Sequence, residues 1–346
     1  MANSSMGPRW QLAMCKELGR LTQGYTCHSN PQHSVTGTDT CQFIHKHDIP
    51  SGKKPTYVCI VADFREQKAD PYQVRCTMGG NLIDFPGEMS TKVADIITVK
   101  CLLNNIVSTT GAKAACIDIK DFYLNNDLPE ADYIRLKADS IPRDFWEQYN
   151  LDQFVDADGY VHAKVWKGIY GLPQPGRVAN DHLLPRLAAE EFNPTTITPD
   201  LFKHTTNSVI FTLVMDDFLV LYMDIADMEL LAATLRQWYT ITVDMQASKF
   251  CSMTLDWDYE QRHCTISIPD YVDKALQQFT HLAPAKPQHS PHPWVAPIFG
   301  ASIQYAAPDD DSTAHDKHGI VKLQQVIGTL LFYTRAVDNT MLVALG

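Results

Sequence analysis

Three aspartates stand beside apolar runs of the sequence. Asp216 and Asp217 separate the β-prone runs VIFTLV and FLVLYM within 208–223, and this spacing predicts a tight hairpin with both carboxylates at its turn. Asp118 interrupts the apolar run 114–119, which predicts a short buried strand. Each carboxylate loses several kcal/mol of hydration in such surroundings unless a cation or a hydrogen-bond donor compensates it.

Carboxylate-only ligand sets suit hard cations such as Mg²⁺. Two strands that each bring aspartate to one end of a sheet can form a binding site for such cations. Two ions held there would stabilise the attacking and leaving oxygens of a phosphoryl transfer. The residues alone therefore indicate metal-dependent phosphoryl transfer, with an Asx turn at the adjacent pair as the simpler alternative. Motifs for nucleotide loops, zinc proteases and serine hydrolases do not occur, although a thiol or hydroxyl nucleophile paired with one of the 13 histidines stays open.

Composition limits the class of protein. A chain of 346 residues with 45% hydrophobic and 20% charged residues fits two or three packed subdomains. It has no run of about 18 apolar residues, and no basic-then-apolar segment at its N-terminus, so we expect no membrane span and an intracellular location. The formal net charge of −11 argues against a partner gripped through phosphates, unless a basic cleft is segregated from an acidic exterior.

The nine cysteines form no CxxC pair, and we expect reduced, mostly buried thiols. Some of the cysteines lie near histidines in a cluster whose spacing matches no standard zinc finger or ribbon. This cluster is either a zinc site or a polar loop with incidental histidines. The cluster comprises Cys27, His28, Cys41, His45 and His47.

Periodicity predicts the elements around the aspartates. Helices are expected over 10–21, 91–107, 178–187, 227–239 and 321–337, with a further helix capped by Asp270. In the helix over 227–239, Asp227 is the candidate cap, and the side chains expected to face the core are Leu230, Leu231, Leu235 and Trp238. Strands are expected over 57–63 and 265–268, and a Pro-rich irregular connection over 281–319.

Four blocks of the sequence resemble the reverse transcriptase of long-terminal-repeat retrotransposons, and are most similar to the copia-type group. They are VADFREQK, CIDIKDFYLN, YGLPQPG and FTLVMDDF, in the family's order over about 160 residues. The later SKFCSMTLDWDY resembles the family's primer-grip segment, and QQVIGTLLFYTRAVD resembles the segment that leads toward ribonuclease H.

This resemblance implies an α+β right-hand polymerase with fingers, an antiparallel-sheet palm and a thumb. It places an N-terminal extension and the start of the fingers at 1–50, fingers at 51–112, a palm with an inserted fingers segment at 113–245, primer grip and thumb start at 246–280, and a Pro-rich connection with a C-terminal helix at 281–346. The implied activity is RNA-directed DNA polymerisation in a cytoplasmic particle or the nucleus. Its implied partners are an RNA or DNA template with primer, and dNTPs. Ribonuclease H and integrase domains are expected of the polyprotein but absent from this chain.

The family's functional residues map onto this chain by motif. Asp118, Asp216 and Asp217 would be catalytic and hold two Mg²⁺ ions. Tyr123 matches the aromatic gate against a ribose 2′-hydroxyl, and Gln174 matches the residue placed against the nascent base pair. Arg65 matches a template-contacting arginine, and Lys53 and Lys54 lie near the usual triphosphate-binding lysine. The basic strip over 53–75 also fits a solvated strand and loop.

The chain departs from the family pattern at three places. Cys59 stands where many members carry a triphosphate-gripping arginine, Val214 replaces an aromatic residue, and LVLYMD over 219–224 is unusually apolar. Together with the acidic balance, these departures indicate weak substrate binding or a decayed, non-catalytic remnant that keeps the fold. A metal-dependent nuclease, or another phosphoryl-transfer enzyme, would explain the aspartates but not the order of the four blocks.

Overall fold

The computed structural model describes residues 7–66, 68–83, 85, 87–89, 91–280, 286, 299–300 and 313–345. Most of the Pro-rich connection expected over 281–319 lies outside these ranges. The chain divides into two compact units. The first comprises Met1–Val93, Asp118–Asn207 and Ala226–Thr242, and the second comprises Ala94–Ile117, Ser208–Ile225 and Val243–Gly346. Both contain helices and strands, so the chain is of the α+β class, and the expected palm range of 113–245 contributes to both.

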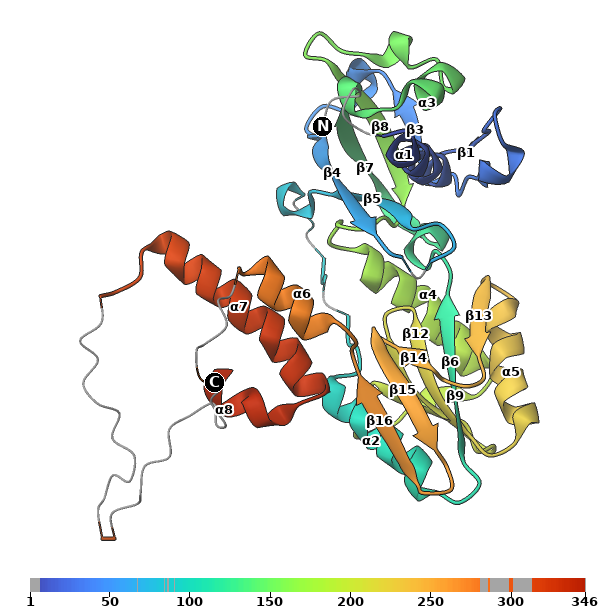
Figure 1. Cartoon of the computed structure of the whole chain (residues 1–346). Helices are drawn as coiled ribbons and strands as arrows, with labels where there is room; N and C mark the ends of the chain where they lie inside the picture. The colour runs from blue at the N-terminus through green and yellow to red at the C-terminus, as the bar shows by residue number, and fades with distance from the viewer. Residues whose placement is uncertain are drawn as a thin grey trace. The chain divides into compact units, whose positions relative to one another are not determined.

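A five-stranded sheet organises the first unit (Figure 1). Its order is β3-β8-β7-β4-β5, and the strands are β3 (Cys41–Ile44), β4 (Thr56–Phe64), β5 (Tyr72–Met78), β7 (Asp127–Lys137) and β8 (Tyr160–Lys167). β4 and β7 run parallel, and the other neighbours are antiparallel. The strand expected over 57–63 is thus confirmed as β4, which pairs with β5 from Val58↔Met78 to Phe64↔Tyr72.

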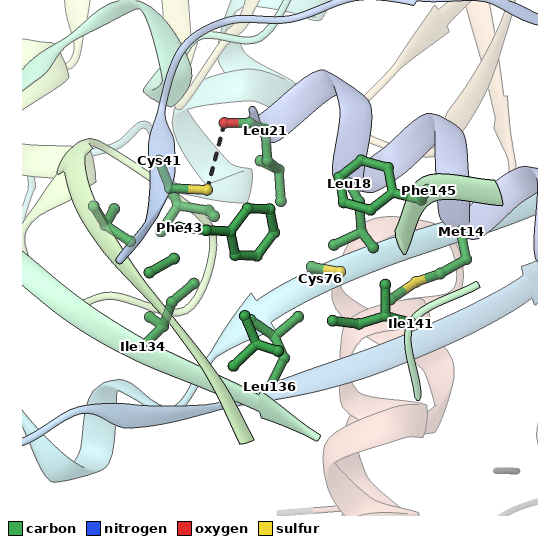
Figure 2. Packing of buried hydrophobic residues seen from close by; sticks show 14 of the residues in the cluster. Met14, Leu18, Leu21, Cys41, Phe43, Cys76, Ile134, Leu136, Ile141 and Phe145 are labelled. Atoms are coloured by element: carbon green, nitrogen blue, oxygen red, sulfur yellow. Dashed lines mark hydrogen bonds between the residues drawn. The ribbon is translucent and has the colours of Figure 1, made fainter. Parts of the chain in front are cut away.

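The helix α1 (Pro8–Leu21) confirms the one expected over 10–21 and packs on β5. Met14, Leu18 and Leu21 recur at helical spacing, so they lie on one buried face of α1. Figure 2 shows these side chains against residues brought from distant parts of the chain, among them Phe43 and Phe145. The thiol of Cys41 donates to the Leu21 carbonyl oxygen at 3.5 Å, which joins β3 to the end of α1.

Smaller elements complete the first unit. They are β1 (Gly24–Tyr25), β2 (Val35–Thr36), α3 (Arg143–Gln148), α4 (Pro175–Ala189), β9 (Phe192–Pro194), β10 (Leu201–His204) and most of α5 (Ile225–Arg236), with 3₁₀ turns at Pro31–His33, Lys46–Asp48, Gly80–Leu82, Tyr123–Asn125, Ala138–Ser140 and Leu151–Phe154. α4 begins three residues before the expected start at 178, because Pro175 is well suited to a first helical turn.

The helix expected over 227–239 needs correction. α5 begins at Ile225, so Asp227 lies inside the first turn instead of capping it. Leu231 and Leu235 are buried as expected, but Leu230 is 40% exposed. Trp238 lies beyond the helix end and is 56% exposed, so it does not face the core; the Arg186 guanidinium lies 4.5 Å from its ring centroid.

Four strands that lie wholly or partly in the second unit are neighbours in the order β13-β6-β12-β11. They are β6 (Lys113–Ile119), β11 (Ile210–Val214), β12 (Asp217–Tyr222) and β13 (Ile241–Asp244), and the strand expected over 114–119 is confirmed as β6. α2 (Ile96–Ser108) begins five residues later than the expected 91. The reason is a cap, since the Asp95 carboxylate accepts from the Thr98 N–H at 2.7 Å and Asp95 itself has an extended backbone.

The rest of the second unit is an antiparallel meander and a helical pair. The elements are β14 (Lys249–Phe250), β15 (Met253–Asp258), β16 (His263–Ser267), α6 (Tyr271–Gln278), α7 (Lys317–Ala336), a 3₁₀ turn (Asn339–Met341) and α8 (Leu342–Leu345). α6 confirms the helix expected after Asp270, but Asp270 has a φ of 59° and makes no side-chain cap, so the expected cap was wrong. Tyr271 stacks on Tyr333 with ring centroids 5.7 Å apart, which joins α6 to α7.

All nine cysteines are described and all are free thiols, as expected. Five are buried, Cys59 and Cys101 are exposed, and Cys251 and Cys264 are partly exposed. Within the described ranges, no helix combines the length and the apolar character that a membrane crossing needs.

Candidate active site

The aspartate pair lies at the hairpin of β11 and β12, as its sequence predicts. Val214 pairs with Asp217, so the turn consists of Met215 and Asp216 alone, and Asp217 is the first residue of β12. Met215 has a φ of 60° whereas Asp216 does not have a positive φ, which is the pattern of a type II′ turn with a non-glycine residue at its first position. A non-glycine residue at positive φ costs about 1–3 kcal/mol of backbone strain, and this conformation persists only where the surrounding structure enforces it.

A second tight turn meets the pair from the β14–β15 hairpin. The Cys251 thiol donates to Oδ2 of Asp217 at 3.7 Å, and Cys251 and Ser252 have φ of 46° and 69°. Burial raises the pKa of the Cys251 thiol, and the Asp217 carboxylate raises it further, so the thiol stays protonated and able to donate. Sequence reasoning missed this contact, because its only signal is a cysteine in the segment that resembles a primer grip.

Asp118 is the penultimate residue of β6 and is exposed, unlike the four buried residues before it. Partial desolvation raises the pKa of its carboxyl; Lys68 acts to lower it and Asp121 to raise it. A basic residue of the 53–75 strip therefore acts electrostatically on Asp118.

A charged cluster holds the turn that follows Asp118. The Arg20 guanidinium pairs with Glu17 at 2.8 Å and with Asp121, which has a φ of 54°. Glu17 is itself buried and accepts the Cys76 N–H at 2.9 Å. The sequence carries only the i,i+3 spacing of Glu17 and Arg20 as a signal, so the role of this pair beside the block CIDIKDFYLN was missed.

Tyr123 lies at a junction of two of the four blocks. Its ring packs edge-on against Tyr170 at 5.3 Å, and the Arg75 guanidinium lies 5.4 Å from the Tyr170 ring centroid. Gly168 makes this approach possible, since a Cβ there would lie 2.7 Å from the Tyr123 carbonyl oxygen. The structure thus brings together Tyr123, the block YGLPQPG through Tyr170, and Arg75 of the basic strip.

Gln174 and Lys53 meet around Asp132 on β7. Gln174 is 3% exposed and donates from Nε2 to Oδ2 of Asp132 at 2.6 Å, while its Oε1 is buried without a partner among the described residues. Lys53 lies 3.0 Å from Glu130 and acts on Asp132. Burial is the main cause that raises the pKa of Asp132; the Gln174 hydrogen bond and Lys53 oppose it.

The other two basic candidates are Arg65 and Lys54. Arg65 pairs through Nε with Asp63 at 2.6 Å, only two residues away. Lys54 is exposed, as is Cys59, which lies opposite Thr77 in the β4–β5 ladder.

Asp118 belongs to the first unit, and Asp216 and Asp217 belong to the second. Their donor chemistry, three carboxylates, is the kind that Mg²⁺ takes. In the part of the chain that the structure describes, no group of three or more His, Cys, Asp or Glu side chains is arranged to hold a metal ion. All five residues of the cluster from Cys27 to His47 lie within the described ranges and form no such group, so the zinc alternative receives no support.

Comparisons with known proteins find similarity among solved structures and none among family models or curated sequences. No protein-family model matches the chain, and no curated protein matches its sequence. Among solved structures, the chain is similar to a foamy viral protease-reverse transcriptase, dRH, in complex with double-stranded DNA, with a TM-score of 0.41 and 10% sequence identity. The match covers 90% of this chain and 44% of that chain, so this chain spans less than half the length of its neighbour.

Proposed function

We propose that this chain is an RNA-directed DNA polymerase of a copia-like retrotransposon. The observation that carries the proposal is the β11–β12 hairpin, whose two-residue turn presents Asp216 beside Asp217 at the end of two apolar strands. The order of the four sequence blocks supports the same activity. Tyr123 and Tyr170, from two of those blocks, lie in contact.

In this proposal Asp118, Asp216 and Asp217 hold two Mg²⁺ ions, to which their hard carboxylate oxygens are suited. When bound, such ions lower the pKa of the attacking primer 3′-hydroxyl and neutralise the leaving pyrophosphate of a dNTP. The Cys251 thiol orients Asp217 through its hydrogen bond. Met215 holds the turn in a conformation that the flanking strands enforce.

The remaining candidates would bind substrate. Tyr123 would exclude a ribose 2′-hydroxyl, and Gln174 would support the nascent base pair from its anchored position on Asp132. Arg65 would contact the template strand, and Lys53 and Lys54 the triphosphate. The template would be RNA or DNA with an annealed primer.

Primer extension on an RNA template with dNTPs and Mg²⁺ tests the proposal, with Asp216→Asn as the variant. We expect extension by the natural chain and a loss of at least about a hundredfold in the variant, because a metal ligand supplies several kcal/mol to the transition state. Asp224→Asn, an exposed aspartate beyond the end of β12, is the matched control and should retain activity. Shortening of the primer instead of extension would favour a nuclease.

A non-catalytic remnant is the second candidate, and Cys59 favours it. A thiol cannot make the charged, bidentate phosphate contact of the arginine that many family members carry there. If neither the natural chain nor its control extends the primer, Cys59→Arg should restore extension where this one loss explains the silence. A folded but inactive Cys59→Arg chain would establish the remnant.

A further inference from the structure

The first unit contains a cavity of about 580 Å³ that lies among α1, the segment 25–33 and the start of α3. Its volume is within the usual range of small-molecule sites. None of the residues given polymerase roles lines it. Its wall includes two thiols, a tyrosine and two arginines, namely Cys15, Cys27, Tyr25, Arg9 and Arg143.

The sulfur of Cys27 has a hydroxyl group beside it. The Ser29 hydroxyl oxygen lies 3.3 Å from Sγ, within hydrogen-bond distance. The Ser29 hydroxyl is the largest influence on the pKa of this thiol and lowers it; burial, the second largest, acts to raise it, and the net shift is downward. Cys27 therefore has more thiolate character than an ordinary cysteine.

Cys15 lies on the same wall and differs in chemistry. Burial raises the pKa of its thiol to about 11, so it is protonated at neutral pH. Of the two thiols in the cavity, Cys27 is the nucleophile, and its 4% exposure means that a reagent must reach it from the cavity side.

The charge of the wall favours an anionic reagent. The lining includes two guanidinium groups, of Arg9 and Arg143, against one carboxylate, of Asp144, and it also includes His33. Arg143 shares its charge with Glu147 at 2.7 Å, whereas Arg9 lies over the Tyr72 ring, 5.5 Å from its centroid. Electropositive surroundings and a stabilised thiolate are the conditions under which thiol–disulfide exchange is fast.

We propose that Cys27 is a modification site that forms mixed disulfides with small anionic disulfides entering this cavity. The Cys27 thiolate attacks one sulfur of R–S–S–R, the S–S bond breaks, and Cys27–S–S–R forms. The other half leaves as R–S⁻, which takes a proton from solvent. Reaction with a small thiol reverses the step, so no further oxidant or reductant is needed.

The test uses the full chain and two small disulfides of similar length, dithiodipropionate, which is anionic, and cystamine, which is cationic. Mass spectrometry of digested samples gives the rate of adduct formation at Cys27 relative to the exposed Cys59 of the same molecule. This ratio removes the difference in intrinsic reactivity between the two reagents. We expect it to be about tenfold higher with dithiodipropionate, because a cleft of one charge sign raises the local concentration of the opposite one.

Matched variants separate the contributions of the wall. Arg9→Gln combined with Arg143→Gln should remove the anionic preference, whereas Arg177→Gln, an exposed arginine that does not line this cavity, should keep it. Ser29→Ala should slow Cys27 several-fold with both reagents. Adducts at Cys59 and Cys101 without one at Cys27 would overturn the site. A preference that survives the double arginine variant would overturn the anionic class.

Discussion

At the scale of single residues, the hydrogen bond between Cys251 and Asp217 can be tested by substitution. A hydrogen bond from a neutral donor to a carboxylate contributes about 1 kcal/mol or more, and Cys251 supplies one to Oδ2 of Asp217. Cys251→Ala removes the donor and should weaken divalent-ion binding about fivefold. Cys251→Ser keeps a hydroxyl donor and should restore most of it. Titration with Mn²⁺, followed by electron paramagnetic resonance, measures this without requiring polymerase activity; equal affinities for the two variants would contradict the positioning role.

Arg20 makes a second prediction at this scale. Its removal would leave the buried carboxylate of Glu17 without its cation and would release Asp121, the residue at positive φ after Asp118. We expect Arg20→Ala to lower the free energy of unfolding by about 2–4 kcal/mol. Arg236→Ala removes an exposed pair with Glu229 at 3.1 Å and should cost less than about 1 kcal/mol. Urea unfolding followed by tryptophan fluorescence compares the two variants.

At the scale of elements, the turn before β8 is stabilised by one carboxylate. Asp156 accepts the N–H groups of Asp158 and Tyr160 at 3.0 and 2.9 Å, the His162 ring at 2.9 Å and Lys46 at 3.0 Å. Burial is the largest single influence and acts to raise the pKa of Asp156. The four donors together outweigh it and hold that pKa well below its usual range.

The sign of the resulting pH dependence follows from this direction. An aspartate with a lowered pKa in the folded state adds stability above its unfolded pKa of about 3.9, and this stability is lost as the pH falls toward the folded value. We therefore expect Asp156→Asn to destabilise the first unit by about 1–3 kcal/mol at pH 7. The gap between the variant and the natural chain should narrow only below about pH 4. Urea unfolding at pH 7 and below pH 4 tests this. A difference in free energy of unfolding that already closes near pH 6 would contradict it.

At the scale of the whole molecule, a net charge of −11 limits how the chain binds nucleic acid. If it binds a primer–template as proposed, we expect the basic strip over 53–75 to release counterions, at a slope of about 0.9 in log K against log salt for each phosphate engaged. We expect Lys54→Gln to lower that slope by about one. Lys164→Gln, which removes an exposed lysine from β8, should leave it unchanged. Fluorescence anisotropy over a salt series measures both.

Local patterns were enough to predict several elements. The sequence alone predicted α1, β4, β6 and the β11–β12 hairpin, because their apolar residues recur at the period of one helix face or alternate with a sharp polar break. The position of Asp216 and Asp217 at the hairpin turn followed from the same pattern. The start of α2 at Ile96 was missed, although Asp95 is a cap that spacing could have identified. Trp238 was expected to face the core, but α5 ends at Arg236, so the helical spacing used to place Trp238 does not extend to it.

Contacts between residues far apart in the chain had to await the tertiary structure. Cys251 meets Asp217 across 34 positions, Gln174 meets Asp132 across 42, and Arg20 meets Asp121 across 101. No periodicity encodes such pairs, because periodicity reports only the face of one element and not which face of another it will meet. The sequence by itself determined which residues carry the proposed chemistry and which strands deliver them. The tertiary structure alone decided which donors hold those carboxylates, and it also assembled the cavity around Cys27 from three separate segments.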